Sequence, residues 1–427
     1  MDLGLKDKRI LLLVSGGIAI YKTLDLISRL KKMGANVFVV MSNKATRFIH
    51  PRTFQAMSGN IVLYKNSESF PQISHISYAK DADVAILAPA TINTIAKLNY
   101  GIADNLIVET LLACKCKVFI APSANINMLE SPQNKANLAS LKKLGYQIIP
   151  PRISRLACDI IANGAMAEVS EIIFALQKSF TKQHFWSDKN IIITGGGSIE
   201  ALDKIRHISN DSSGKQASNL ALAFYMLGAN VTLIASKFPL DLPLDIVKIP
   251  VKTSLDFKNN IEKTLKNHIK ATKLAPKNHN ILLMAAAISD FVPEKIAQGK
   301  IKKDKIGTKW QLNLIENMDI LRQIASEFCN SCFIVGFKTE SFGDEITQKE
   351  RDLASLNAKK MLVSKHCDMV ILNIISKLNN IGDDCNEISI FTHKKELKIP
   401  KNNKLNISFE IAKILEKTCA TKDSKHC

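Results

Sequence analysis

The sequence predicts an α/β protein built from two doubly wound, Rossmann-like domains. Three observations carry this prediction: apolar runs alternate with amphipathic stretches, a glycine-rich turn follows the first apolar run of each half, and one ten-residue pattern occurs twice. Such alternation is typical of a parallel sheet whose two faces are covered by helices. A chain of 427 residues is also long enough to bury two separate hydrophobic cores.

The first half, residues 1–180, begins with the apolar run RILLLVS and continues with a regular alternation of strands and helices. We expect its strands at 9–15, 35–42, 84–89 and 117–122, and helices at 21–34 and from Thr91 onward. Two glycines follow the first strand, which is the arrangement that lets a helix N-terminus hold a phosphate.

Periodicity is lost over 181–189, and we expect a linker there. The pattern then restarts with a strand at 190–197, a helix within 214–227 and a strand at 229–236. MGANVFVVMS (33–42) is echoed by LGANVTLIAS (227–236), which supports two related folds. The second domain is expected to run over 190–415, and residues 416–427 are expected to form a flexible tail.

The two glycine turns differ in the length of chain between turn and helix. The second turn, TGGG, is separated from its helix by about 14 residues more than the first, and these polar residues are expected to handle substrate rather than to pack. Neither turn has the G-x-G-x-x-G spacing, and no acidic residue ends the second strand, so a nicotinamide dinucleotide is not predicted. The turns alone indicate a phosphate near a helix N-terminus.

Composition excludes several classes of protein. No apolar stretch is long enough to cross a membrane, and the N-terminus lacks the features of a signal peptide, so we expect a cytoplasmic protein with no membrane partner. The nine cysteines show no disulfide framework, and Cys114–Cys116 and Cys329–Cys332 are interpreted as structural rather than zinc-binding. The net charge of +19 is spread along the chain without a basic tract, which makes nucleic-acid binding a minor hypothesis.

The first half resembles the flavin-dependent phosphopantothenoylcysteine decarboxylases. The resemblance rests on SGGIAIYK, SHIS, APATINTIAKLNYGIADNL, PSANINM and LAC. It implies that His75 is catalytic, that Asn125 holds the substrate carboxylate, and that Cys158 donates a proton late in the reaction. The residues that it places along FMN are Ser15, Gly16, Gly17, Ser42, Pro89, Thr91 and Asn93.

The chemistry of that family explains these residue types. Direct loss of CO₂ from the cysteinyl carboxylate would leave an unstabilised carbanion, so a flavin first oxidises the thiol end to a thioaldehyde that can accept the electrons. An amide such as Asn125 can orient the carboxylate without the salt bridge that would stabilise its ground state. A thiol such as Cys158 can return the proton.

The second half is similar to the phosphopantothenate–cysteine ligases, and the fused bacterial enzyme of coenzyme A synthesis has both halves in this order. The likeness rests on TGGGSIEALDKIRHISNDSSGK, AAAISDF, KIKK, NMDIL, VGFKTE and KHCDMVILN. It implies that 4′-phosphopantothenate, cysteine and CTP react through an acyl-cytidylate, with Mg²⁺ on the phosphates. Asn210 would stabilise that intermediate and Lys300 the charge at the α-phosphate. The residues placed along CTP are Ala286, Asp290, Lys300, Asn317, Asp319, Ile320, Phe337 and Lys365.

Several positions depart from these families. After Cys158 the families have a glycine-rich flap with an arginine, whereas this chain has Asp159, Ala162 and Ala165. In the second half, Ile199 and Met318 replace a usual arginine and proline. A flap needs glycine hinges and a cation for phosphate, so the decarboxylase is where we expect the largest loss.

Two further hypotheses stay open on the sequence. One is a divergent flavin-binding scaffold that has lost part or all of its catalysis, and the other is a decarboxylase of a different thiol-ended substrate. The resemblance also implies a homo-oligomer built on trimers, with the flavin at a subunit interface.

Overall fold

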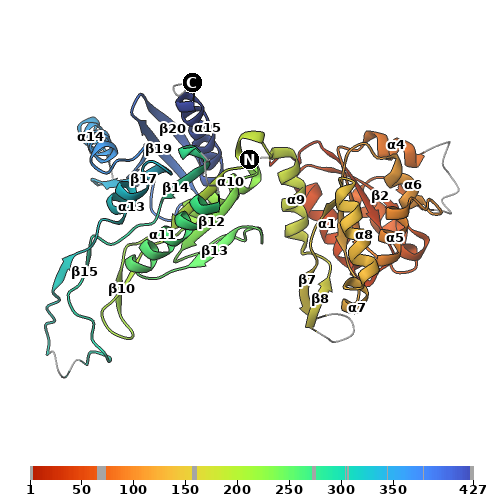
Figure 1. The fold of residues 1–427 in the computed structure, drawn as a ribbon, viewed down its shortest axis with the longest axis horizontal. Coiled ribbons are helices and arrows are strands. Elements are labelled where there is room, and N and C mark those ends of the chain that lie inside the picture. Colours follow the sequence, from red (N-terminus) through yellow and green to blue (C-terminus); the bar gives the residue numbers. More distant parts are fainter. Residues whose placement is uncertain are drawn as a thin grey trace. The chain divides into compact units, whose positions relative to one another are not determined.

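Two separate sheets organise the chain in the computed structural model, one in each of two units, Asp2–Thr181 and Lys182–Cys427 (Figure 1). The structure describes residues 3–64, 74–155, 161–271, 276–302, 304, 307–343, 345–377 and 379–423. Both units combine a largely parallel sheet with helices, which confirms the predicted fold class.

The first sheet has six parallel strands, and its first strand lies next to the middle of the sheet. In spatial order the strands are β3 (Val62–Leu63), β2 (Asn36–Met41), β1 (Arg9–Val14), β4 (Val84–Ala90), β5 (Lys117–Pro122) and β6 (Gln147–Ile148). The strand order reverses between β1 and β4, so the crevice at their carboxyl ends is where such a sheet binds a ligand.

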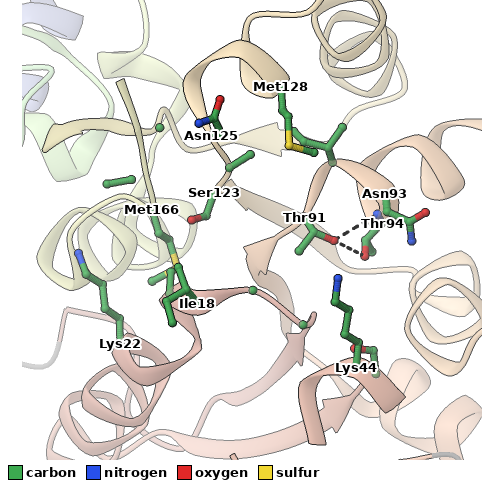
Figure 2. Close-up of a pocket in the computed structure, with 18 of the residues that line it drawn as sticks. Ile18, Lys22, Lys44, Thr91, Asn93, Thr94, Ser123, Asn125, Met128 and Met166 are labelled. Atoms are coloured by element: carbon green, nitrogen blue, oxygen red, sulfur yellow. Dashed lines mark hydrogen bonds between the residues drawn. The ribbon is translucent and has the colours of Figure 1, made fainter. Parts of the chain in front are cut away.

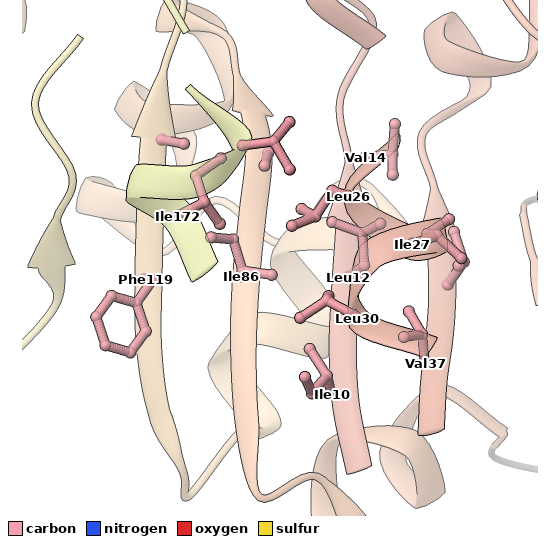
Figure 3. Close-up of a cluster of buried hydrophobic side chains, with 14 of the residues drawn as sticks. Ile10, Leu12, Val14, Leu26, Ile27, Leu30, Val37, Ile86, Phe119 and Ile172 are labelled. Atoms are coloured by element: carbon pink, nitrogen blue, oxygen red, sulfur yellow. The ribbon is translucent and has the colours of Figure 1, made fainter. Parts of the chain in front are cut away.

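Helices cover both faces of this sheet because alternate strand residues point to opposite sides. Ile10 and Leu12 join one buried cluster, whereas Leu11 and Leu13 join the other. Figure 3 shows the first cluster, with Leu26 of α1 and Ile172 of α9 packed over β1 and β4. One face carries α1 (Tyr21–Lys32), α3 (Pro51–Ser58) and α9 (Val169–Thr181); the other carries α4 (Ser74–Asp81), α5 (Ile92–Tyr100), α6 (Leu106–Ala113) and α8 (Pro132–Lys143).

The second sheet repeats this order and adds two antiparallel strands at one edge. In spatial order its strands are β13 (Val247–Pro250), β12 (Asn230–Ala235), β9 (Asn190–Gly195), β14 (Asn280–Met284), β17 (Phe333–Ser341), β18 (Met369–Ile375), β19 (Cys385–Thr392) and β20 (Glu396–Asn403). The shared order of the first six strands confirms that the repeated sequence pattern marks two related folds.

The helices of the second unit again lie on both sides of its sheet. A single buried cluster joins α11 (Ser254–Ala271), α13 (Ile320–Phe328) and α14 (Gln348–Ser364), while α10 (Lys215–Leu227) packs against α15 (Lys404–Asp423). Of the helices in the described ranges, none combines the length and the apolarity that a bilayer crossing requires.

Three small antiparallel pairs lie outside the main sheets. They are β7 (Arg152–Arg155) with β8 (Ile161–Ala165), β10 (Ile199–Ala201) with β11 (His207–Ser209), and β15 (Phe291–Pro293) with β16 (Leu314–Glu316). The β10–β11 hairpin accounts for most of the extra residues after the second glycine turn.

The segment expected to be a linker is ordered and packs into the second unit. Its residues His184–Trp186 form a short 3₁₀ helix, and the Trp186 ring is fully buried with its centroid 5.0 Å from that of Phe224. At the other end, α15 continues through Asp423, and Cys419 within the expected flexible tail is buried. Trp186 and Cys419 therefore both contribute buried side chains to the second unit, which corrects the two expectations for the described residues.

Candidate active sites in two cavities

The first glycine turn is tied to the strand beside it. The Ser15 hydroxyl donates to the Pro89 carbonyl over 2.6 Å and accepts from the Thr91 amide over 3.0 Å. Ser15 is itself buried, and its two hydrogen bonds link the carboxyl ends of β1 and β4. Thr91 then begins α5, since its hydroxyl accepts from the Thr94 amide at 3.4 Å.

The glycines of this turn allow close approach of neighbouring groups. A Cβ added at Gly16 would lie 2.5 Å from Cγ of Lys44, and one added at Gly17 would lie 3.4 Å from Cγ2 of Thr91. A side chain at position 16 would therefore collide with Lys44, so glycine is needed for the loop after β2 to pack against this turn. Both glycines also line the cavity described next, where a backbone without side chains beside the start of a helix fits the close approach of a flavin nucleotide.

A cavity of about 910 Å³ opens above this turn (Figure 2). It is bounded by the loops after β1, β2, β4 and β5 and by the β7–β8 pair. The loop after β5 is held against β8 because the Ala124 amide donates to the Gly164 carbonyl over 3.1 Å. Asn125 comes next in that loop and begins the short helix α7 (Ile126–Leu129), accepting from the Asn127 amide at 2.9 Å.

Most residues placed along FMN by the sequence do line this cavity, together with Asn125. They are Gly16, Gly17, Ser42, Thr91 and Asn93. Ser15 and Pro89 do not line the cavity, but the hydrogen bond between them stabilises the turn. His75 is half-buried on α4 and is not among the lining residues, and Cys158 lies outside the described residues.

The lining of the first cavity is basic. It contains no aspartate or glutamate among its described residues, whereas four side chains are cationic. These are Lys22, Lys44, Lys97 and Arg152. A cavity of this composition attracts anions, because positive potential in a partly enclosed site is screened less than on an open surface.

In the second unit, the glycine turn after β9 holds a longer loop in place. Gly196 has a φ of +78°, and a Cβ added at Gly197 would lie 2.4 Å from the Asn210 carbonyl oxygen. The Ser236 hydroxyl donates to the Gly197 carbonyl over 2.7 Å. The Asn210 amide group donates to the Ile288 carbonyl over 3.1 Å, so the loop after β11 is fixed against the loop after β14.

This loop borders a second cavity of about 880 Å³, which opens at the carboxyl end of β14 and extends along β17 and β18. Five of the sequence-predicted residues line it: Asn210, Ala286, Asp290, Phe337 and Lys365. Residues 210–214, the last part of the long insertion, also line it, as expected for residues that handle substrate.

Four predicted residues do not line the second cavity, although two of them support residues that do. The backbone N–H of Asn317 donates to the backbone carbonyl of Asp290 over 2.8 Å. The Asp319 carboxylate lies 3.0 Å from the Lys365 amine. Ile320 is buried in the core behind them. Lys300 is exposed and lies beside Ile301, whose amide donates to Asp203 over 3.1 Å.

Several cations that line the cavities were not singled out by the sequence analysis. They include Lys44 and Arg152 in the first cavity and Lys360 in the second. Lone basic residues carry little signal in a chain with 58 lysines and arginines. For Lys44 a signal was nevertheless available, because it comes just after Ser42 at the end of a predicted strand.

The two cysteine motifs have ordinary structural surroundings. Among the described residues, no group of three or more histidine, cysteine, aspartate or glutamate side chains could hold a metal ion. The Cys114 thiol donates to the Thr110 carbonyl, and burial raises the pKa of the Cys332 thiol far above its usual range. The interpretation of these cysteines as structural rather than zinc-binding stays a prediction.

Together, the two sheets and their cavities define a two-domain α/β protein with a large cavity in each domain. Comparison with known proteins assigns each domain to a protein family. Residues 3–181 match the Flavoprotein family, and residues 186–418 match the DNA/pantothenate metabolism flavoprotein C-terminal domain. The first domain is therefore of the flavoprotein type.

The chain belongs to the family of the coenzyme A biosynthesis bifunctional proteins CoaBC. It is 36% identical over 417 residues to the CoaBC protein of Bacillus subtilis. That alignment covers 95% of this chain and 96% of the Bacillus subtilis protein. It is 31% identical over 411 residues to the CoaBC protein of Escherichia coli, covering 94% and 95% of the two chains.

Solved structures match each half separately. The C-terminal domain of a coenzyme A biosynthesis bifunctional protein CoaBC covers 56% of this chain and all of that domain, at 21% identity and a TM-score of 0.43. A PPC decarboxylase mutant complexed with pantothenoylaminoethenethiol covers 40% of this chain and 97% of its own, at 30% identity and a TM-score of 0.37.

Proposed function

We propose that this chain catalyses two consecutive steps of coenzyme A synthesis. The second unit joins cysteine to 4′-phosphopantothenate at the expense of CTP, and the first unit decarboxylates the product to 4′-phosphopantetheine. One observation carries the proposal: the bifunctional relatives match across both units, and each unit has its own cavity at the strand ends.

In the first cavity, FMN would supply the oxidation and re-reduction that make loss of CO₂ possible. The turn at Gly16 and Gly17 lets the cofactor approach the backbone, and Thr91 and Asn93 present polar groups at the start of α5. Asn125 lies across the cavity and would orient the substrate carboxylate through its amide (Figure 2). His75 and Cys158 remain proposed catalytic residues.

In the second cavity, the side chains suit an anionic nucleotide and a phosphorylated acid. Asn210 would stabilise the acyl-cytidylate as pyrophosphate leaves. Lys365, aligned by Asp319, would face the triphosphate, with Lys360 beside it. Asp290, held by Asn317, would contact the nucleotide together with Phe337 and Ala286. We propose that Lys300 closes on the α-phosphate and that Mg²⁺ is held mainly by the phosphates.

We further propose a homo-oligomer built on trimers and a cytoplasmic location. The seven cysteines within the described part of the chain are all free, as expected in a reducing compartment. The size of the assembly can be measured by light scattering on the purified full chain.

The function is tested by supplying 4′-phosphopantothenate, cysteine, CTP and Mg²⁺ and following pyrophosphate and CO₂ separately. We expect both products, Asn210→Ala to abolish pyrophosphate release, and Asn125→Ala to abolish CO₂ release alone. Pyrophosphate without CO₂ would show that the altered flap has cost the decarboxylase. Neither product from a folded, flavin-loaded protein would leave the scaffold hypothesis instead.

A further inference from the structure

The four cations of the first cavity differ in whether a carboxylate neutralises them. Lys22 and Arg152 both pair with Glu168, at 3.4 and 2.6 Å, and Lys97 pairs with Asp104. Within the part of the chain that the structure describes, Lys44 makes no ion pair. Among these four, Lys44 is therefore the one without a carboxylate partner in the described ranges, whereas Lys22 and Arg152 share a single carboxylate.

The position of Lys44 is fixed by the glycine turn. Ser42 begins the short helix α2 (Asn43–Thr46), accepting from the Ala45 amide at 3.1 Å, and this places Lys44 over the loop after β1. Its stem lies so close to Gly16 that an added Cβ would come within 2.6 Å of both Cβ and Cγ of Lys44. The base of the side chain thus packs on the glycine turn, although Lys44 as a whole is exposed, and the residue lines the cavity.

The Lys44 amine points toward the beginning of α5 (Figure 2). Thr91 lies there, against Gly17, and its hydroxyl is 3.0 Å from the Thr94 hydroxyl. The first turn of a helix presents unpaired amides and the positive end of the helix dipole, both of which favour an anion. A lysine, two hydroxyls and a helix N-terminus consequently meet at one end of the cavity.

We propose that the Lys44 ammonium pairs with the 5′-phosphate of bound FMN and makes the cavity select FMN over unphosphorylated flavin. The proposal rests on the proposed function of the first unit, because it takes the cavity to be the flavin site. A phosphomonoester fits this end since it carries up to two negative charges and several acceptor oxygens.

The test is to titrate flavin-free protein with FMN and, separately, with riboflavin, following the quenching of flavin fluorescence. Lys44→Met removes the charge and keeps the stem that packs on Gly16, whereas Lys44→Arg keeps a cation. Lys32→Met makes the same change of net charge at an exposed position at the end of α1. Neither substrate is present, so the assay reports flavin binding and not turnover.

We expect Lys44→Met to weaken FMN binding by about tenfold or more, as loss of a charge-assisted contact should, while riboflavin binding stays unchanged. Lys44→Arg should retain most of the preference for FMN, and Lys32→Met should match the unmodified protein. Added salt should weaken FMN binding less in Lys44→Met than in the unmodified protein.

Equal weakening of FMN and riboflavin would overturn the proposal, because Lys44 would then act on the ring or on the fold. Unchanged FMN binding would overturn it as well and would leave the phosphate of the substrate as the anion that Lys44 meets. If the unmodified protein bound neither flavin, the proposed function of the first unit would fail, an outcome that the variants cannot mimic.

Discussion

Arg152 on β7 and Ala165 on β8 lie directly opposite each other across an antiparallel strand pair, and both line the first cavity. From the sequence, no cation is expected at this flap, because alanine stands at position 165. The structure brings a guanidinium to the same place from the neighbouring strand. Arg152 is held there by Glu168, whose carboxylate lies 2.6 Å from Nη1.

The first prediction is that Arg152 on β7 does the work of the arginine that is missing at position 165 on β8. Arg152→Ala should raise KM for 4′-phosphopantothenoylcysteine about tenfold, since a charge-assisted contact to the substrate phosphate is lost. The double variant Arg152→Ala, Ala165→Arg should recover most of the loss by restoring the cation from the opposite strand. Steady-state CO₂ release measures both, and pyrophosphate release by the ligase serves as the internal control. A double variant as impaired as the single one would refute this role for Arg152.

The second prediction concerns the glycine turn of the ligase unit. An alanine at position 197 would place its Cβ 2.4 Å from the Asn210 carbonyl oxygen, a contact that only a shift of the backbone can relieve. Gly197→Ala should therefore displace Asn210 and reduce pyrophosphate release about 100-fold, by analogy with losing one transition-state contact. CO₂ release from added 4′-phosphopantothenoylcysteine should be unchanged. Normal ligation would mean that Asn210 does not need this turn.

The third prediction concerns Asp203, which ties the β10–β11 hairpin to the segment bearing Lys300. Its carboxylate accepts from the amides of Arg206 and Ile301 over 2.7 and 3.1 Å, and these hydrogen bonds lower the pKa of Asp203 from 3.8 to about 2. Because the folded pKa is depressed, this stabilisation is complete above about pH 4 and is lost as the pH falls toward 2.

Removing that charge at neutral pH should have the same local effect. Asp203→Asn should speed tryptic cleavage after Lys300 and lower pyrophosphate release, because the segment no longer docks through Ile301. The exposed Asp241→Asn provides the matched control. Digestion followed by mass spectrometry gives the cleavage rate. Equal rates in the two variants would argue against Asp203 as the anchor.

The features that the sequence predicts correctly are those set by interactions between residues close together in the chain. The strand at 9–15 and the helix from Thr91 could be predicted because apolar periodicity and helix capping are local properties. The pairing of Arg152 with Ala165 could not, since it depends on a register with a β-bulge between Arg152 and Ile153. Likewise, the sequence does not show that Lys360 lines the second cavity together with Lys365, because that depends on how α14 packs beside β17 and β18.

Residues 181–189, the expected linker, are a second case in which a contact between distant residues was not predictable from local sequence. The last prediction concerns this segment. Residues 181–189 lack periodicity, yet Trp186 is fully buried against Phe224 through a contact between distant parts of the sequence. Trp186→Ala should lower the free energy of unfolding of the second unit by about 3–5 kcal/mol.

Scanning calorimetry checks this, with flavin fluorescence reporting the first unit. The transition of the second unit should fall by about 6–20 °C, while that of the first unit stays in place because Trp186 and its partner Phe224 both belong to the second unit. Trp310→Ala is the matched control, since that ring is 44% exposed and in the same unit. A loss of stability as small as that of the control would mean that residues 182–189 are a tether, and that the second core is complete without them.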